Sequence, residues 1–454
     1  MHQRTTKRRP FRAPDPGRLE RHTPFLDVLG RVRVHSHRWY RCRAGLMVLE
    51  FVDRVWSSRR ASADVGVHRR LAVCRAIAAV TPNASRTVLE EVLHLASPGA
   101  DPQPEALTAL MDYGKRLQYE SEFRLASHVY WMVVNYANHI EHVELLPGAY
   151  EHHGTCMREC GDSQAAMASY AQGLAIATRH RNTRARLRIG CAQANLHRAL
   201  GNIDQARKVL DPLLHRARTL GVPELLMRAA HERGLVAWKC KKYKEALHFY
   251  AEAFRNCADP KHRGRLLNDI ALSLHELGLV DDAHRTWLAS YLATQGDRYA
   301  KWAAGVNLLM LAVERKHKDV FDQYAKALAR APMPARLLIE YWQRVGDGSI
   351  VFDRLSEAHA AWQRAAAYAA RYGYGEELTR AKRALAGDHE KPRIPPSPPA
   401  SLSVAGEALL ANVRALSSLP GLLGRAWDGD VHAVSQHSLR TSLRRGRPPK
   451  SEIT

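Results

Sequence analysis

Residues 228–255 read RAAHERGLVAWKCKKYKEALHFYAEAFR, in which two amphipathic helical patterns flank a short basic break at Lys239–Lys242. In the second pattern the small residue Ala246 is followed four positions later by Tyr250, so both side chains lie on one face of a helix. The small residue lets another helix approach closely, and the ring fills the space beside it. This stretch therefore predicts two antiparallel helices joined by a short turn.

The same arrangement recurs along the chain at a nearly constant step. Gly114, Gly154, Ala194 and Gly234 are spaced by 40 residues, and the step then tightens to about 37. In the second helices a small residue is followed four positions later by a large one: Ala126/Tyr130, Ala166/Tyr170, Ala206/Leu210, Ala246/Tyr250, Ala283/Trp287 and Ala358/Trp362. Between the last two of these pairs, Phe321 occupies the position of the small residue. Such a period is typical of solenoids, whose repeats bury their apolar faces against their neighbours.

The breaks between these patterns have the composition of helix–helix turns. Gly161 is followed by Asp162 and Gly201 by Asn202. A glycine closes one helix in the left-handed conformation, and the next side chain caps the start of the following helix. We expect turns near residues 120, 161, 201, 241, 278 and 354.

The order of these residues resembles the tetratricopeptide repeat (TPR), a helix–turn–helix unit with the pattern W-x2-L-G-x2-Y, then A, then Y or F, then A. Trp342-x2-Val345-Gly346, followed by Ala358, Trp362 and Ala365, carries the resemblance, as do Gly234, Ala246, Tyr250 and Ala253. The resemblance covers residues 104–386 and implies an all-α, right-handed superhelical solenoid of about seven helix pairs. The unit is longer than the usual length of about 34 residues, as in TPR regulators of bacterial signalling. A helical array of another repeat class is the alternative.

The charge of the chain is unusual and concentrated at its ends. The net charge is +23, and residues 1–75 hold 18 Lys and Arg against 6 Asp and Glu. Residues 440–454 hold five basic residues against one acidic residue. Basic ends on a nearly neutral body suggest contact with a polyanion.

Composition also suggests how the rest of the chain is organised. We expect a basic disordered arm over 1–30, a basic helical cap over 31–103, a Pro-rich linker over 387–402 and a largely disordered tail over 403–454, with a weak helix at Val404–Leu416. The bases interleaved with Trp39 and Tyr40 in the cap could bind nucleic acid, and a solvated helix face is the alternative.

The resemblance to TPR first helices also implies which side chains face a concave groove. At the corresponding positions the chain carries arginines and asparagines, which can bind carboxylates or phosphates. The expected partner-binding residues are Arg158, Arg188, Asn195, Arg198, Arg228, Arg265 and Asn268. The alternative is that these arginines are solvated or pair with Glu151, Glu232 and Glu276.

The C-terminal run RRGRPPK resembles the AT-hook of high-mobility-group A chromatin proteins, whose core is R-G-R-P. In such a motif the two core arginines lie in the narrow minor groove of A·T-rich DNA and the flanking bases contact phosphates. The expected DNA-binding residues are Arg444, Arg445, Gly446, Arg447, Pro448 and Lys450. An ordinary basic terminus is the alternative.

No pattern in the sequence points to chemistry. There is no glycine-rich phosphate loop, H-E-x-x-H or G-x-S-x-G motif, and the seven cysteines are scattered without a C-x-x-C pair. We expect no catalytic residue, metal, cofactor, small-molecule substrate or membrane span, and a cytoplasmic location. The sequence thus predicts a non-catalytic scaffold or adaptor that binds an acidic protein or peptide in its concave groove. The alternative is a nucleic-acid-associated regulator that contacts DNA through its basic ends and senses a partner through the repeats.

Overall fold

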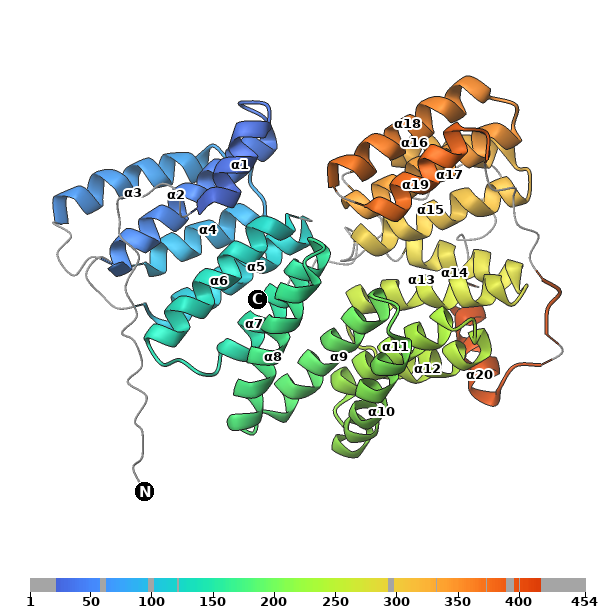
Figure 1. The fold of residues 1–454 in the computed structure, drawn as a ribbon, viewed down its shortest axis with the longest axis horizontal. Helices are drawn as coiled ribbons and strands as arrows, with labels where there is room; N and C mark the ends of the chain where they lie inside the picture. The colour runs from blue at the N-terminus through green and yellow to red at the C-terminus, as the bar shows by residue number, and fades with distance from the viewer. Residues whose placement is uncertain are drawn as a thin grey trace, which may run out of the picture. The chain divides into compact units, whose positions relative to one another are not determined.

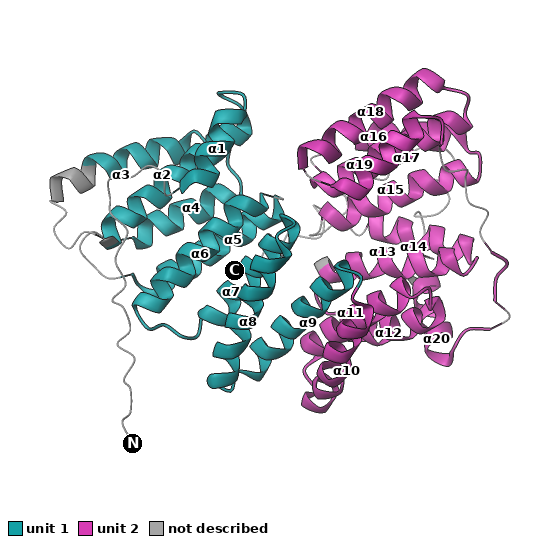
Figure 2. Cartoon of the chain, viewed as in Figure 1, with its two compact units in different colours: residues 1–201 teal, residues 202–454 magenta. Residues whose placement is uncertain are grey.

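The computed structural model describes residues 22–57, 63–96, 102–120, 122–292, 298–331, 333–372, 374–388, 396–399 and 401–417. All regular structure in these ranges is helical, which confirms the expected all-α fold (Figure 1). The chain divides into two compact units, residues 1–201 and 202–454 (Figure 2).

Unit 1 contains nine of the helices. They are α1 (Thr23–Arg31), α2 (His37–Ser57), α3 (Ala63–Ala78), α4 (Ala84–Leu95), α5 (Pro104–Tyr119), α6 (Phe123–His139), α7 (Leu146–Glu159), α8 (Ser163–Arg179) and α9 (Thr183–Ala199). Helix α1 begins inside the range 1–30 that the sequence assigns to an arm. It forms there because Phe25 is completely buried between α1 and its neighbours.

Unit 2 contains the remaining helices. They are α10 (Ile203–Leu220), α11 (Pro223–Lys239), α12 (Tyr243–Arg255), α13 (Pro260–Glu276), α14 (Val280–Leu292), α15 (Arg298–Glu314), α16 (Lys318–Leu328), α17 (Ala335–Val351), α18 (Leu355–Tyr372), α19 (Gly375–Leu385) and α20 (Val404–Ser417). Of the seven expected helix pairs, six lie within one unit, and α9 and α10 fall on either side of the division.

The turns within the pairs lie where the sequence predicts them. Gly161 and Gly278 have φ angles of 85° and 77°, and Lys241 and Asp353 adopt the same left-handed conformation without being glycine. After Gly161, the Asp162 amide N–H donates to the Met157 carbonyl at 2.9 Å, the closing bond of a Schellman motif.

Only one of the two expected N-cap side chains makes its bond. The carboxylate of Asp162 accepts from the Ala165 amide at 2.9 Å, whereas the side chain of Asn202 makes no capping hydrogen bond. The turn at Gly201 is therefore closed by its backbone alone.

The recurring large residues pack on the glycines of the preceding helix. A Cβ atom on Gly114 would lie 2.6 Å from a ring carbon of Tyr130, and one on Gly154 would lie equally close to Tyr170. Gly234 meets Tyr250, and Gly346 meets Trp362, in the same way. The sequence analysis predicts that each ring packs beside the small residue of its own helix. In the structure the ring instead packs mainly against the glycine of the facing helix, where only glycine leaves room.

Candidate partner-binding surface

The first helices of successive pairs are joined by polar contacts between residues about one repeat apart. In unit 1, a nitrogen of Arg188 on α9 lies 2.8 Å from a carboxylate oxygen of Glu151 on α7. The Arg158 guanidinium of α7 donates to the side-chain oxygen of Asn195 on α9. Each contact spans 37 residues, close to the 40-residue step of this part of the chain.

Unit 2 continues this pattern with different residue types. The ring of His231 on α11 lies 2.8 Å from the carboxylate of Asp269 on α13, and the Asn307 amide of α15 donates to Asn268 at 2.9 Å. His275 and Glu314 pair at 2.7 Å, and both side chains are almost fully buried. We call these contacts, in either unit, the cross-repeat ladder.

The ladder changes the interpretation of the groove residues predicted in unit 1. Arg158 is hydrogen-bonded to Asn195, and Arg188 pairs with the buried carboxylate of Glu151. The alternative interpretation of the sequence named Glu151 as such a partner. Arg198, in the last turn of α9, is half-buried and takes no part in the ladder contacts described above. Of these four residues, Arg198 is the best placed to contact a partner.

In unit 2 the structure brings Arg228 and Arg265 to the same place. The imidazole of His262, in the first turn of α13, has its pKa lowered first by burial and then by the charges of these two arginines. The Asp259 carboxylate, 2.8 Å from the His262 ring, acts in the opposite direction. Arg228 of α11 and Arg265 of α13 therefore both lie within electrostatic range of one imidazole, beside the carboxylate of Asp259.

The orientation of Arg265 is fixed by an aromatic ring. Its guanidinium carbon lies 5.5 Å from the ring centre of Tyr299 on α15, within the range of cation–π contact. We call Arg228, His262, Arg265 and Tyr299 the α13 basic cluster. Arg188, the third residue of the predicted strip, belongs to unit 1, so the continuous strip of three stays a prediction.

Sequence reasoning placed His275 on the groove wall, but it missed His231 and the acids of the ladder in unit 2. His231 and Asp269 lie 38 positions apart, and His275 and Glu314 lie 39 apart. Complementary side chains one repeat length apart on successive first helices would have revealed them. The TPR pattern directs attention to positions that face a ligand, whereas these side chains face the next repeat.

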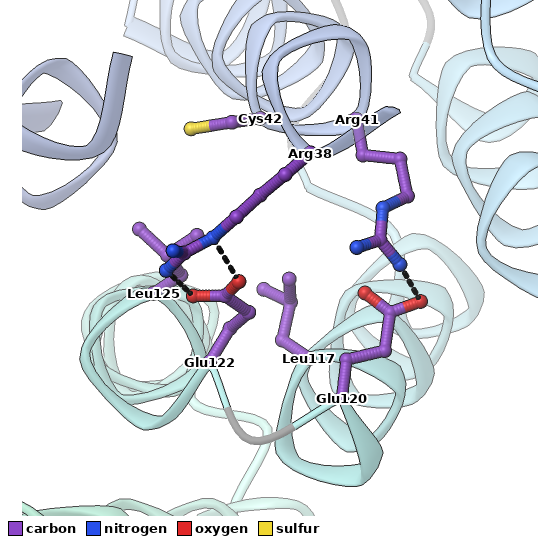
Figure 3. Close-up of a pocket in the computed structure, with 7 residues that line it drawn as sticks. All are labelled: Arg38, Arg41, Cys42, Leu117, Glu120, Glu122 and Leu125. Atoms are coloured by element: carbon purple, nitrogen blue, oxygen red, sulfur yellow. Dashed lines mark hydrogen bonds and ion pairs between the residues drawn. The ribbon is translucent and has the colours of Figure 1, made fainter. Parts of the chain in front are cut away.

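The N-terminal cap is attached to the first repeat by two arginines of α2. Arg38 donates two hydrogen bonds to Glu122, at 2.5 and 2.7 Å, and Arg41 lies 2.7 Å from Glu120 (Figure 3). The two glutamates flank the turn between α5 and α6. The small pocket between these ion pairs is lined by Arg38, Arg41, Cys42, Leu117, Glu120, Glu122 and Leu125.

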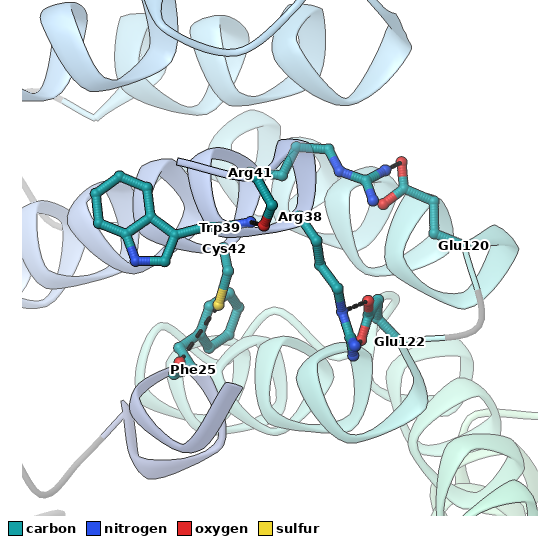
Figure 4. Close-up of polar contacts among 8 residues, drawn as sticks. Phe25, Arg38, Trp39, Arg41, Cys42, Glu120 and Glu122 are labelled. Carbon is teal, nitrogen blue, oxygen red and sulfur yellow. Dashed lines mark hydrogen bonds and ion pairs between the residues drawn. The ribbon is translucent and has the colours of Figure 1, made fainter. Parts of the chain in front are cut away.

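Neither of these arginines nor the neighbouring thiol is available for chemistry. Cys42 donates to the Phe25 carbonyl at 3.3 Å, and burial, with help from Glu122, raises the pKa of the thiol to about 12 (Figure 4). A protonated thiol is a poor nucleophile. The pocket is therefore a structural joint. Elsewhere on α2, the exposed Arg43 has its guanidinium 5.3 Å from the ring centre of Trp39.

The predicted DNA-binding residues, Arg444 to Lys450, lie outside the described residues. Among the residues that are described, no group of three or more His, Cys, Asp and Glu side chains could hold a metal ion. In the same part of the chain, no helix is long and apolar enough to span a membrane.

No protein-family model matches the chain, and no curated protein matches it. Among solved structures, it is similar to the Rap conjugation gene regulator of plasmid pLS20 in complex with the Phr* peptide, with 14% identity, coverage of 75% of this chain and 97% of that one, and a TM-score of 0.49. It is also similar to a Rap protein complexed with competence and sporulation factor, with 14% identity, coverage of 77% and 100%, and a TM-score of 0.46. Because the identities and TM-scores are this low, the function has to be inferred from the contacts of this chain itself.

Proposed function

We propose that the chain is a non-catalytic, TPR-like scaffold that binds an acidic segment of a protein or peptide along the first helices of its pairs. The observation that carries the proposal is that Arg228 and Arg265, one repeat apart on the first helices α11 and α13, both act on the ring of His262, with Arg265 held over Tyr299. A positive potential on a polar helix wall is complementary to carboxylates, and guanidinium groups bind them with two parallel hydrogen bonds.

The cross-repeat ladder supports this proposal by holding the wall rigid. Asn268 is fixed by Asn307, and Arg265 is fixed over Tyr299, so little side-chain freedom remains to be lost on binding. The binding residues that we propose are Arg228, Arg265 and Asn268 in unit 2, and Arg198 of unit 1 stays a separate prediction. Arg158, Arg188 and Asn195 contribute by holding α7 and α9 together.

A labelled oligoglutamate peptide, with a neutral peptide of the same length for comparison, tests the proposal. The double variant Arg228→Glu/Arg265→Glu should bind the acidic peptide at least about tenfold more weakly than the unmodified chain. Arg207→Glu/Arg216→Glu is the matched control, because both arginines are exposed on α10 of the same unit and the net charge changes equally. Equal weakening by the two double variants would mean that overall charge, and not the α13 basic cluster, binds the peptide.

A second function, contact with nucleic acid through the basic ends, is favoured by the charge distribution and by the surroundings of Trp39. This ring lies against His35, with centroids 5.4 Å apart, and has Arg43 over it. Bases stacked on an aromatic side chain and phosphates paired with nearby arginines are typical of single-strand binding. Single-stranded DNA should then not compete with the acidic peptide for its site on unit 2. Trp39→Ala should weaken the binding of DNA and leave the binding of the peptide unchanged.

A further inference from the structure

The helix α20 returns to the repeats of unit 2 after the Pro-rich segment and lies beside α12 and α14, the second helices of two consecutive pairs (Figure 1). It buries Leu409, Leu410 and Val413 against them. These residues occupy positions i, i+1 and i+4, so they form one narrow apolar face.

The charged contact beside this face is specific. The guanidinium of Arg414 donates two hydrogen bonds to the carboxylate of Asp282, both at 2.8 Å, from 132 residues away in the chain. The Asp282 side chain is 9% exposed, whereas that of Arg414 is 51% exposed. A nearly buried carboxylate left without its partner is costly, so the surface of α14 selects for an arginine at this place.

A third contact to the same surface is made by the segment that precedes α20. The carbonyl group of Pro396 lies directly against Gly278 in the turn between α13 and α14, where a Cβ atom would collide with it. Gly278 also has a φ angle of 77°. The same surface is therefore contacted by an extended segment, an apolar helix face and an arginine.

These contacts are few for a helix of this length. Among its described side chains α20 buries three apolar residues over 14 positions, whereas α12 buries six residues over 13. A helix as short as α20 is marginal in water by itself. It therefore depends on docking for its order, and docking is favoured mainly because the linker keeps α20 close to the site.

From these contacts we infer that α12 and α14 form a binding site for an amphipathic helix that carries an arginine, and that α20 is a reversible ligand of this site in cis. The site requires the apolar face of Leu409, Leu410 and Val413 together with Arg414. Release of α20 leaves both the apolar surface and the Asp282 carboxylate open to another helix of the same chemistry.

The full chain and a labelled peptide of residues 396–417 test this inference. The Arg414→Glu chain loses its cis ligand, so it should bind the unmodified peptide at least about tenfold more tightly than the unmodified chain does. A peptide with the same Arg414→Glu change should not bind. The Asp282→Asn chain, whose site itself is altered, should bind neither peptide well.

Gly278→Ala and Gly161→Ala provide a second, independent comparison. Both glycines close a turn with a positive φ, but no atom lies within 4 Å of a Cβ on Gly161. Hydrogen exchange of the amides in 404–417 should become faster in Gly278→Ala than in Gly161→Ala. Three results would each overturn the inference. The Arg414→Glu chain could fail to bind the peptide, or hydrogen exchange could be as slow in α20 as in α12. The third is that α20 docks on a second copy of the chain instead of on its own.

Discussion

The ring of Tyr250 lies against the backbone of Gly234 on the preceding helix, so closely that no side chain fits between them. Both residues are buried, and the same contact joins Gly114 to Tyr130 and Gly154 to Tyr170. The contact explains why glycine and a large ring recur together along the chain: each pair of helices is held at close distance by a ring lying on bare backbone.

Replacing Gly234 by leucine should force α11 and α12 apart. Overpacking of this kind costs about 1–3 kcal/mol of the free energy of unfolding, and thermal or urea unfolding followed by circular dichroism measures it. Gly375→Ala is the control, since no atom lies within 4 Å of a Cβ there, and it should be neutral or slightly stabilising. An unfolding curve of Gly234→Leu that matches the unmodified chain would disprove the packing assignment.

The cross-repeat ladder predicts that Arg188 stabilises the fold more than it binds a partner. Arg188→Ala leaves the Glu151 carboxylate buried without its cation, which should cost about 1–3 kcal/mol. Glu151→Gln in the same chain should recover part of that loss. A double-mutant cycle measures the coupling, and additive effects of the two changes would show that the pair does not stabilise unit 1.

A half-buried histidine makes unit 1 sensitive to acid. The ring of His153 lies 2.8 Å from Ser169 Oγ, and burial lowers its pKa from 6.5 to about 4. Between these two values the unfolded chain binds more protons than the folded chain, so stability is complete above pH 6.5 and falls as the pH drops toward 4.

His153→Gln should remove this share of the pH dependence. The slope of the unfolding free energy between pH 4.5 and 6 should decrease by up to about 1.4 kcal/mol per pH unit. His94→Gln, at an exposed position of α4, is the matched control. Parallel pH profiles for His153→Gln and the unmodified chain would show that His153 is protonated as easily in the folded state as in the unfolded state.

The C-terminal motif predicts a weak, groove-specific contact with DNA. Arg445 and Arg447 should enter the minor groove of A·T-rich duplex, while Arg444 and Lys450 hold phosphates. Because the amino group of guanine projects into the minor-groove floor, G·C duplex should bind less well, and the salt dependence should be modest since few phosphates are neutralised. A peptide of residues 430–454 titrated with both duplexes measures this, and equal affinities would leave only an ordinary basic tail.

Much of the fold follows from the sequence because the repeat itself is local. The turns at Gly161 and Gly278 need only a left-handed residue, and the Gly234–Tyr250 contact needs only two neighbouring helices. The docking of α20 could not be predicted in the same way. It depends on Arg414 reaching Asp282, 132 residues earlier, and no periodic pattern connects the two.

The candidate site was less predictable than the fold. The TPR pattern gives the face on which Arg158 and Arg188 lie, but whether an arginine there binds a ligand or a neighbour depends on what the next repeat offers. Asn195 and Glu151 face those arginines, so they became ladder contacts. Arg228 and Arg265 instead both lie within electrostatic range of His262 in the first turn of α13.

Locating the bound acidic peptide tests the proposed site of Arg228 and Arg265 directly. An oligoglutamate peptide with a photoreactive group at one end should crosslink to residues of α11 and α13 around Arg228 and Arg265, as mapped by mass spectrometry. Those crosslinks should disappear in Arg228→Glu/Arg265→Glu and persist in Arg207→Glu/Arg216→Glu. Crosslinks confined to the second helices α12 and α14, or unchanged in the first double variant, would contradict the account.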